Sequence, residues 1–376
     1  MMMVPRPVRH FGQLLIALLF LLGIKTWSNS SFEVTQEKGR DAILRKSTNL
    51  SGGASLPRAP PEGAAPPAPT SPPAGSTVLV LSSVGRSGSS FLAELLSQRP
   101  NTFYSFEPMH YYEKSTRMAL SPRLAWDIVE ALSSCRLEEH WLRTTARRGL
   151  LRSEAGAICQ TTDAELAVSC GGESCRNRSH LLVKTIRMRV SWLPELLLRL
   201  GPGLRVVHLV RDPRASFRSS VTYAPSQKDH TTYCPLILED LFMVDTVKKL
   251  FPGAMASVKY EDLCLDAEGV ATDLWRFISG DSTAALPPSW ARYIQVHTAP
   301  SKAGRGAYNT WRDSQKEAEQ WRQEIDEDLL LGVEKSCGQV IELLGHNKFH
   351  SLANARNWSF PLRRTPRALY SHIDVP

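Results

Sequence analysis

The stretch "VLVLSSVGRSGSSFLAELL", residues 78–96, decides how this chain folds. Residues 78–81 are apolar and rich in β-branched side chains, which predicts a buried strand. From Phe91 onward the apolar residues recur at helical spacing, so a helix follows. The turn between them contains glycine, serine and one arginine. Such a unit directs backbone N–H groups and the positive end of the helix dipole toward one point, which predicts an anion site; an ordinary tight connection is the alternative.

The chain beyond this unit alternates between strand and helix patterns. The expected strands are 77–82, 181–184, 204–210 and 256–260. The expected helices are 91–98, 125–132, 192–200, 235–250 and 325–344. This alternation predicts an α/β fold with a mainly parallel central sheet flanked by helices. Ligands of such sheets bind beyond the carboxyl ends of the strands, where the turn after residue 82 is expected to lie.

Composition limits the class of protein and its partners. The 376 residues are 42% hydrophobic and 22% charged, which is typical of a globular chain. The formal net charge of +8 favours anionic partners. No long block of lysine and arginine is present, so nucleic acid is not expected among them.

The N-terminal part predicts attachment to a membrane. Basic residues precede an uncharged apolar run at 11–24, and no convincing cleavage site follows it. We therefore expect a cytoplasmic tail at 1–10 and a signal-anchor transmembrane helix at 11–27, which makes a single-pass type II protein. A cleaved signal peptide is the alternative. Residues 28–76 are rich in proline and predict a disordered stem.

Both interpretations place the rest of the chain in a secretory lumen. Four Asn-x-Ser/Thr sequons agree with this placement: Asn29, Asn49, Asn177 and Asn357. The seven cysteines lack a tandem zinc-binding spacing and therefore predict disulfides. Because seven is odd, at least one thiol is free or pairs with another chain.

A second informative stretch is "LRVVHLVRDPRASFRSS", residues 204–220. Arg211 is expected where a buried strand leaves the sheet, and Ser219 on the helix that follows. Both side chains could reach one phosphate, with the guanidinium binding it through two N–H groups. The alternative for Arg211 is a salt bridge, for example to Asp212.

These two stretches resemble the nucleotide-binding motifs of a known family. "RSGSSF" at 86–91 is similar to the 5′-phosphosulfate loop of the Golgi carbohydrate sulfotransferases, and "LVRDPRA" followed by Ser219 is similar to their 3′-phosphate motif. "FYSFEP" (103–108), "LVKTIR" (182–187) and "VKYEDL" (258–263) also match. The specific group that the chain resembles is the Gal/GlcNAc/GalNAc 6-O-sulfotransferases.

The resemblance implies a P-loop-like sulfotransferase domain at 77–350, followed by a C-terminal tail at 351–376. It implies the donor 3′-phosphoadenosine 5′-phosphosulfate (PAPS), without a metal, and a hydroxyl of Gal, GlcNAc or GalNAc, expected to be O-6, as the acceptor. The acceptor would belong to a glycan, glycoprotein, proteoglycan or glycosaminoglycan, and the protein would reside in the Golgi membrane. A homodimer is left open.

The resemblance also assigns roles to individual residues. The donor would be bound by Arg86, Ser87, Gly88, Ser89, Ser90, Phe91, Arg211 and Ser219. Arg86 would also act in catalysis, because its charge can neutralise the oxygen that bridges phosphorus and sulfur as that bond breaks.

A carbohydrate hydroxyl needs a general base, and Glu107 in "FEP" is the candidate. Its alternative role is to cap a turn, and His110 is the rival base. Lys184 and Arg187 either face the donor or acceptor anions or flank a buried strand. The acids of "YED" (260–262) are expected to start a helix or support the fold.

Two other functions stay open from the sequence. A P-loop kinase requires lysine and Ser/Thr directly after the last glycine of the loop, whereas Gly88 is followed by Ser89 and the basic residue precedes it. A non-catalytic lumenal carbohydrate-binding relative would have no need for both donor motifs.

Overall fold

A five-stranded sheet forms the centre of the protein, and all of its strand pairs are parallel. The computed structural model describes residues 76–110, 120–137, 164–225, 228–299, 310 and 313–364. The strands are β1 (Ser76–Ser82), β2 (Thr102–Phe106), β3 (His180–Thr185), β4 (Leu204–Val210) and β5 (Met255–Lys259). Their order is β2-β3-β1-β4-β5, which places β1 in the middle. The expected parallel α/β sheet is therefore confirmed.

Each strand is buried on both faces because apolar residues follow one another along it. In β1, Val78 and Val80 pack into one hydrophobic core, whereas Leu79 and Leu81 pack into a second core on the opposite face. This alternation is what the period of two along a strand requires when helices cover both sides.

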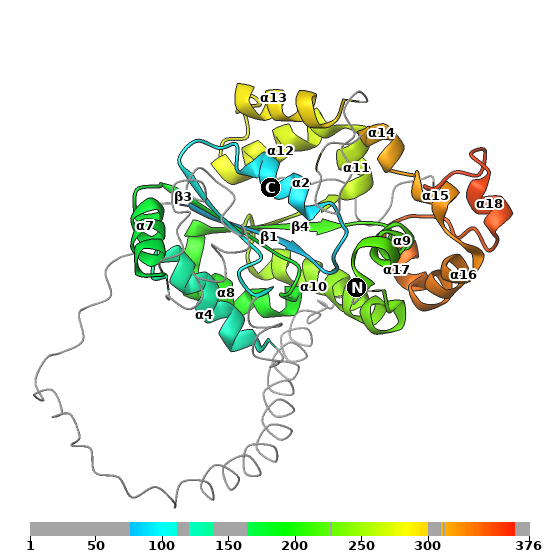
Figure 1. Ribbon diagram of the computed structural model, residues 1–376, viewed down its shortest axis with the longest axis horizontal. Helices are drawn as coiled ribbons and strands as arrows, with labels where there is room; N and C mark the ends of the chain where they lie inside the picture. Colours follow the sequence, from blue (N-terminus) through cyan, green and yellow to red (C-terminus); the bar gives the residue numbers. More distant parts are fainter. Residues whose placement is uncertain are drawn as a thin grey trace, which may run out of the picture. The chain divides into compact units, whose positions relative to one another are not determined.

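Two layers of helices cover the opposite faces of the sheet (Figure 1). One layer contains α2 (Ser89–Leu96), α11 (Tyr260–Leu265), α12 (Ala267–Ser279) and α13 (Pro288–His297). The other contains α4 (Pro122–Ser133), α8 (Leu193–Leu200) and α10 (His230–Leu250). The remaining elements before α10 are α7 (Ala164–Arg176), η1 (Val190–Trp192), η2 (Gly201–Gly203) and α9 (Pro213–Tyr223).

A third group of helices comes from the C-terminal part of the chain. It consists of α14 (Ser314–Glu317), α15 (Trp321–Glu324), α16 (Glu327–Ser336), α17 (Gly338–Leu343) and α18 (Leu352–Arg356). In Figure 1, α15, α16 and α18 lie together in orange and red. Ala355 and Leu362, from the segment expected to be a tail, are buried in a core with Trp321 and Phe349. Residues 352–362 therefore pack against the folded domain, while the predicted domain boundary stays a prediction.

The structure differs from the expectation of one continuous helix at 325–344. Two helices, α16 and α17, replace it, with Cys337 between them. Cys337 forms a disulfide with Cys234 on α10, and both cysteines are buried. The break therefore coincides with the residue that is covalently linked to α10.

Disulfides are present as expected. A second one joins Cys135 to Cys175, and Cys170 is also disulfide-bonded. Cys264 is free and buried, and burial raises the pKa of its thiol to about 12. The predicted tail, anchor and nearly all of the stem (1–75) lie outside the described residues. Within the part of the chain that the structure describes, no helix combines the length and the apolar character that crossing a membrane requires.

Candidate active site

The residues expected to bind the donor lie at the carboxyl edge of the sheet. The turn 83–88 follows β1, and Arg211 follows β4, the strand paired with β1. The chain passes from β3 on one side of β1 to β4 on the other. This reversal makes a switch point beyond the ends of β1 and β4, which is where α/β proteins bind ligands.

The turn at 83–88 requires a glycine immediately before α2. Gly88 has φ of +88° and is the N-cap residue of α2. A Cβ atom at Gly88 would lie 2.3 Å from Cε2 of Tyr260, the first residue after β5. Both the left-handed backbone and the packed ring therefore exclude other residues at this position.

Polar contacts hold the buried start of this turn. Ser82 donates to Ser87 with an Oγ–Oγ distance of 2.7 Å, and both side chains are buried. Arg189 Nη2 donates to the carbonyl oxygen of Ser83 (2.9 Å), while its Nη1 pairs with buried Asp240 (3.0 Å). The backbone after β1 is thus fixed by a charged pair that joins the segment after β3 to α10.

Arg86 joins the two predicted motifs. Its Nε donates to Ser219 Oγ (3.1 Å), and its guanidinium lies 5.2 Å from the ring centre of Tyr223 on the same helix, α9. Arg211 Nη1 donates to the carbonyl oxygen of Arg86 (2.9 Å). The structure therefore brings the loop residue Arg86 together with Arg211 and Ser219, although 125 and 133 positions separate them in sequence.

Arg211 has a buried donor that is not used. Its guanidinium lies over the ring of Tyr260, 4.1 Å from the ring centre. Among the described residues no partner accepts the hydrogen bond of its buried Nε. Asp212, the expected alternative partner, instead binds Arg214 and His346. The salt bridge between Arg211 and Asp212 was therefore the wrong alternative.

The other predicted donor residues lie at the start of α2. Ser89 is its first residue and is buried, and Ser90 is partly exposed. Phe91 packs against Tyr293 of α13, with 5.6 Å between the ring centres. Phe91 thus contributes to the interface between two helices.

Glu107 lies directly after β2 and is enclosed by cations. It is buried, has φ of +51°, and its oxygens accept hydrogen bonds from Lys184 and Arg187. Burial raises the pKa of this carboxyl, but the two positive charges outweigh that effect and hold it below its usual value of 4.5. Arg187 also contacts Nδ1 of His110. Because a guanidinium only donates, Nδ1 of the neutral imidazole must be the acceptor.

The acids of "YED" support the fold, as expected. Glu261 accepts a hydrogen bond from the backbone N–H of Asp212 (2.9 Å), and Asp262 pairs with Arg363 (2.6 Å). Both are in the first turn of α11.

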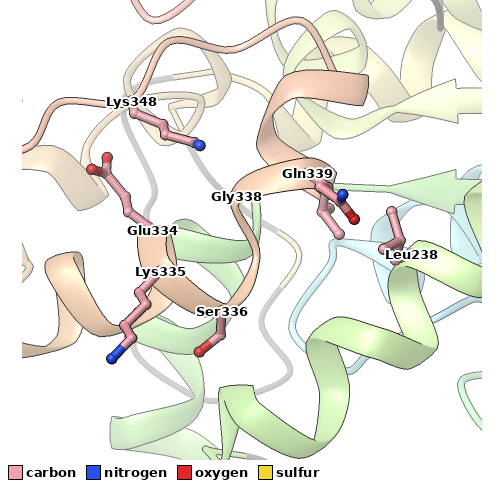
Figure 2. Close-up of a pocket in the computed structure, with 8 residues that line it drawn as sticks. Leu238, Glu334, Lys335, Ser336, Gly338, Gln339 and Lys348 are labelled. Carbon is pink, nitrogen blue, oxygen red and sulfur yellow. The ribbon is translucent and has the colours of Figure 1, made fainter.

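A separate hollow of about 440 Å³ lies over α10, α16 and α17 (Figure 2). It is lined by Leu238, Glu334, Lys335, Ser336, Gly338, Gln339, Val340 and Lys348. None of these residues belongs to the loops at the carboxyl edge of the sheet. Within the described ranges, no group of three or more His, Cys, Asp and Glu side chains could hold a metal ion.

The fold and this edge define an α/β protein in which the two motif segments meet at the switch point of the sheet. A model of the sulfotransferase family matches residues 79–281, which is more than half of the chain. The chain belongs to this family and is an enzyme of the sulfotransferase class.

Known proteins resemble the chain along most of its length. Human carbohydrate sulfotransferase 3 is 26% identical over 339 residues, covering 76% of this chain and 70% of that protein. Mouse carbohydrate sulfotransferase 5 is 26% identical over 336 residues, covering 76% of this chain and 84% of that protein. The solved sulfotransferase domain from the curacin biosynthetic pathway has a TM-score of 0.41 at 16% identity, covering 71% of this chain and 97% of that domain.

Sequence patterns did not reveal the buried partners of the motif residues. The pairing of Glu107 with Lys184 depends on β2 and β3 being neighbours, which a linear pattern does not specify. The contacts of Arg189 with Ser83 and Asp240 join three segments of the chain. The position of Arg189 just after an expected strand was the signal that could have drawn attention to it.

Proposed function

We propose that this protein transfers a sulfuryl group from PAPS to a carbohydrate hydroxyl, namely O-6 of a Gal, GlcNAc or GalNAc residue. One observation carries the proposal: the turn after β1 and Arg211 after β4 meet at the switch point, where Arg211 binds the backbone of Arg86. The relatives named carbohydrate sulfotransferases support a carbohydrate acceptor.

The residues at this edge suit a donor with two anionic ends. Arg211 offers a buried Nε–H without a partner among the described residues, and a charged donor left unpaired in this way favours an anion. Arg211 and Ser219 would hold the 3′-phosphate. The backbone N–H groups and serine hydroxyls of residues 87–90 would hold the 5′-phosphosulfate. PAPS supplies the sulfuryl group that is transferred.

Arg86 would provide the charge that assists the departure of the nucleotide. Its backbone contacts Arg211 and its side chain contacts Ser219, so it belongs to both halves of the site. A fixed guanidinium can stabilise negative charge that develops on the oxygen bridging phosphorus and sulfur.

Glu107 is the proposed general base. Its lowered pKa keeps it ionised, so it can accept the proton of the attacking hydroxyl, although its ion pairs with Lys184 and Arg187 make it a weak base. His110 is a weaker candidate, because its Nδ1 already accepts a hydrogen bond from Arg187 and the neutral ring then carries its proton on Nε2.

The proposed setting is the Golgi membrane, with the catalytic domain in the lumen and a glycan, glycoprotein or proteoglycan as acceptor. The disulfides and the exposed sequon residues Asn177 and Asn357 support an oxidising lumen. The proposal includes a membrane anchor formed by residues 11–27.

The transfer reaction is tested with PAPS carrying labelled sulfur and a panel of Gal, GlcNAc and GalNAc glycosides and glycosaminoglycan oligosaccharides. Each acceptor is paired with its 6-deoxy analogue as the matched control. We expect label in at least one 6-hydroxy acceptor and none in its analogue. Equal labelling of the 6-deoxy analogue would contradict transfer of the sulfuryl group to O-6.

Two other results would replace the proposed reaction. PAPS that binds without transfer to any acceptor would favour the non-catalytic relative. Phosphoryl transfer from ATP would favour the kinase.

A further inference from the structure

A buried negative charge lies next to the proposed 3′-phosphate site. Asp212 follows Arg211 directly and its side chain is fully buried. Burial raises the pKa of this carboxyl, but Arg214 and His346 outweigh that effect and hold it well below its usual value of 3.8. The carboxylate is therefore ionised at neutral pH. An unneutralised charge next to Arg211 in the chain would disfavour a phosphate bound by that arginine.

Arg214 binds this carboxylate through two parallel hydrogen bonds. Its Nε donates to Asp212 Oδ1 (3.0 Å) and its Nη2 donates to Oδ2 (2.7 Å). Both side chains are inaccessible to solvent. Two-point pairing of this kind is among the strongest contacts available to a carboxylate. His346 Nδ1 also lies 3.0 Å from Asp212 Oδ2.

The C-terminal part of the chain holds Arg214 in this position. Its Nη1 donates to Glu334 Oε1 on α16 (2.6 Å), and its guanidinium lies 4.7 Å from the ring centre of Phe349 and 5.0 Å from that of Trp321. Glu334 is fixed in turn by the backbone N–H of Phe349 (2.7 Å) and of His350 (2.9 Å). The neutralisation of Asp212 thus depends on residues from a distant part of the sequence.

We propose that Arg214 is a positioning residue that gives the site its preference for a 3′-phosphate, because it neutralises the buried carboxylate of Asp212, the residue next to Arg211. This inference rests on the proposed function, in which Arg211 holds the 3′-phosphate. Arg214 itself does not contact the nucleotide. Its effect is carried by Arg211, whose Nε has no partner among the described residues.

The experiment compares the affinities of the full protein for adenosine 3′,5′-bisphosphate and adenosine 5′-phosphate by calorimetry. The preference is the ratio of the two dissociation constants. Three variants address the mechanism: Arg214→Gln, Asp212→Asn, and the two combined. Arg322→Gln is the matched control, because Arg322 is similarly buried and stacks on the same Phe349 ring. Its hydrogen bonds go to the carbonyl oxygens of Ala355, Asn357 and Phe360, and it pairs with Glu319.

In Arg214→Gln we expect the preference to fall about tenfold, because a negative charge next to the phosphate loses its counter-charge. The combined variant should recover the wild-type preference, since the amide that replaces the carboxylate carries no charge. Asp212→Asn alone should keep or increase it. Arg322→Gln should lower the thermal stability and leave the preference unchanged, as any purely structural role would.

The outcomes separate this inference from the proposed function. A wild-type protein without preference for the bisphosphate would contradict the proposed function itself. A normal wild-type preference that is unchanged in Arg214→Gln, or lost equally in the combined variant, would overturn the role of Arg214. If Arg214→Gln does not fold, Asp212→Asn decides, because a lower preference in that variant would overturn the proposal.

Discussion

Arg86 is the residue at which the two segments proposed to bind the donor meet. Its side chain donates to Ser219, and its carbonyl oxygen accepts from Arg211. The backbone at this residue is left-handed, with φ of +64°, a conformation that a bulky side chain adopts only when its surroundings hold it there. The hydrogen bonds of its side chain and of its carbonyl oxygen supply that restraint.

Replacing Arg86 by alanine should lower the turnover of sulfuryl transfer about a hundredfold or more, since a charge aimed at the developing negative charge is removed. Turnover at saturating PAPS measures the effect. Arg123→Ala, which removes an exposed arginine on α4, is the control and should behave like the wild type. Near-normal turnover of a folded Arg86→Ala protein would remove the loop from the mechanism.

Glu107→Gln should lower the free energy of unfolding by about 3–5 kcal/mol at pH 7, because Lys184 and Arg187 lose a buried counter-charge. Urea unfolding measures this difference. The pKa of Glu107 is lower in the folded state than its usual value of 4.5, so the carboxylate stabilises the fold above that pH. This contribution is lost as the pH falls through the lowered pKa, and the two proteins should converge in acid.

The exposed pair of Glu195 with Arg199 provides the control for this comparison. Glu195→Gln should change the free energy of unfolding by less than about 1 kcal/mol, as is usual for surface ion pairs. The stabilising role of the buried ion pairs would be contradicted if Glu107→Gln also lost less than about 1 kcal/mol. It would be contradicted too if the stability difference between Glu107→Gln and the wild type persisted undiminished in acid.

At the scale of elements, the turn between β1 and α2 depends on a ring from another strand end. Tyr260 begins α11, and its ring occupies the space that a side chain at residue 88 would need. The same ring packs under Arg211. One aromatic residue after β5 therefore shapes both the loop after β1 and the arginine after β4.

Gly88→Ala should abolish nucleotide binding and destabilise the protein, because the added Cβ would overlap Tyr260. Gly280→Ala is the matched control: Gly280 also has a positive φ, +73°, but nothing lies within 4 Å of its added Cβ. The control should cost about 1–2 kcal/mol of stability from backbone strain alone and leave nucleotide binding intact. Equal behaviour of the two variants would show that the ring does not shape the loop.

Local sequence patterns predicted which helices and strands form better than they predicted the residues at which those elements begin and end. The strand expected at 204–210 agrees with β4, because its β-branched residues favour a strand and its short length suits one. The helix expected from residue 235 begins five residues earlier, at His230, and contains Pro235 in its interior, although proline is most common at the first position of a helix. The break at Cys337 is tied to a disulfide partner 103 residues away, which no local pattern contains.

The candidate site was predictable where one segment carries the chemistry. Arg86 and Arg211 were recognisable because each follows an expected strand, and parallel strands end at one edge of the sheet. The neutralisation of Asp212 by Arg214 was not predictable from the sequence, although the two residues are near neighbours, because Arg214 is held in place by Glu334 from α16. Buried charge networks are tertiary features.

At the scale of the whole molecule, residues 76–364 contain the sheet and all of the proposed site. A protein beginning near Thr77, secreted behind a foreign signal peptide, should therefore retain transfer activity, because the proline-rich segment before it lacks the sequence to form a core. Specific activity relative to the full chain is the measurement. A folded but inactive shortened protein would show that the segment before Thr77 contributes to the chemistry.

The central claim is that Arg211 holds a 3′-phosphate, and the most direct measurement is the affinity of Arg211→Ala for adenosine 3′,5′-bisphosphate and for adenosine 5′-phosphate. Loss of a charged hydrogen bond costs about 1.5–3 kcal/mol, so binding of the bisphosphate should weaken more than about tenfold. Binding of the 5′-phosphate should change little, because that nucleotide never made the contact. Equal weakening of both nucleotides would contradict the account, since Arg211 would then support the fold and not the phosphate.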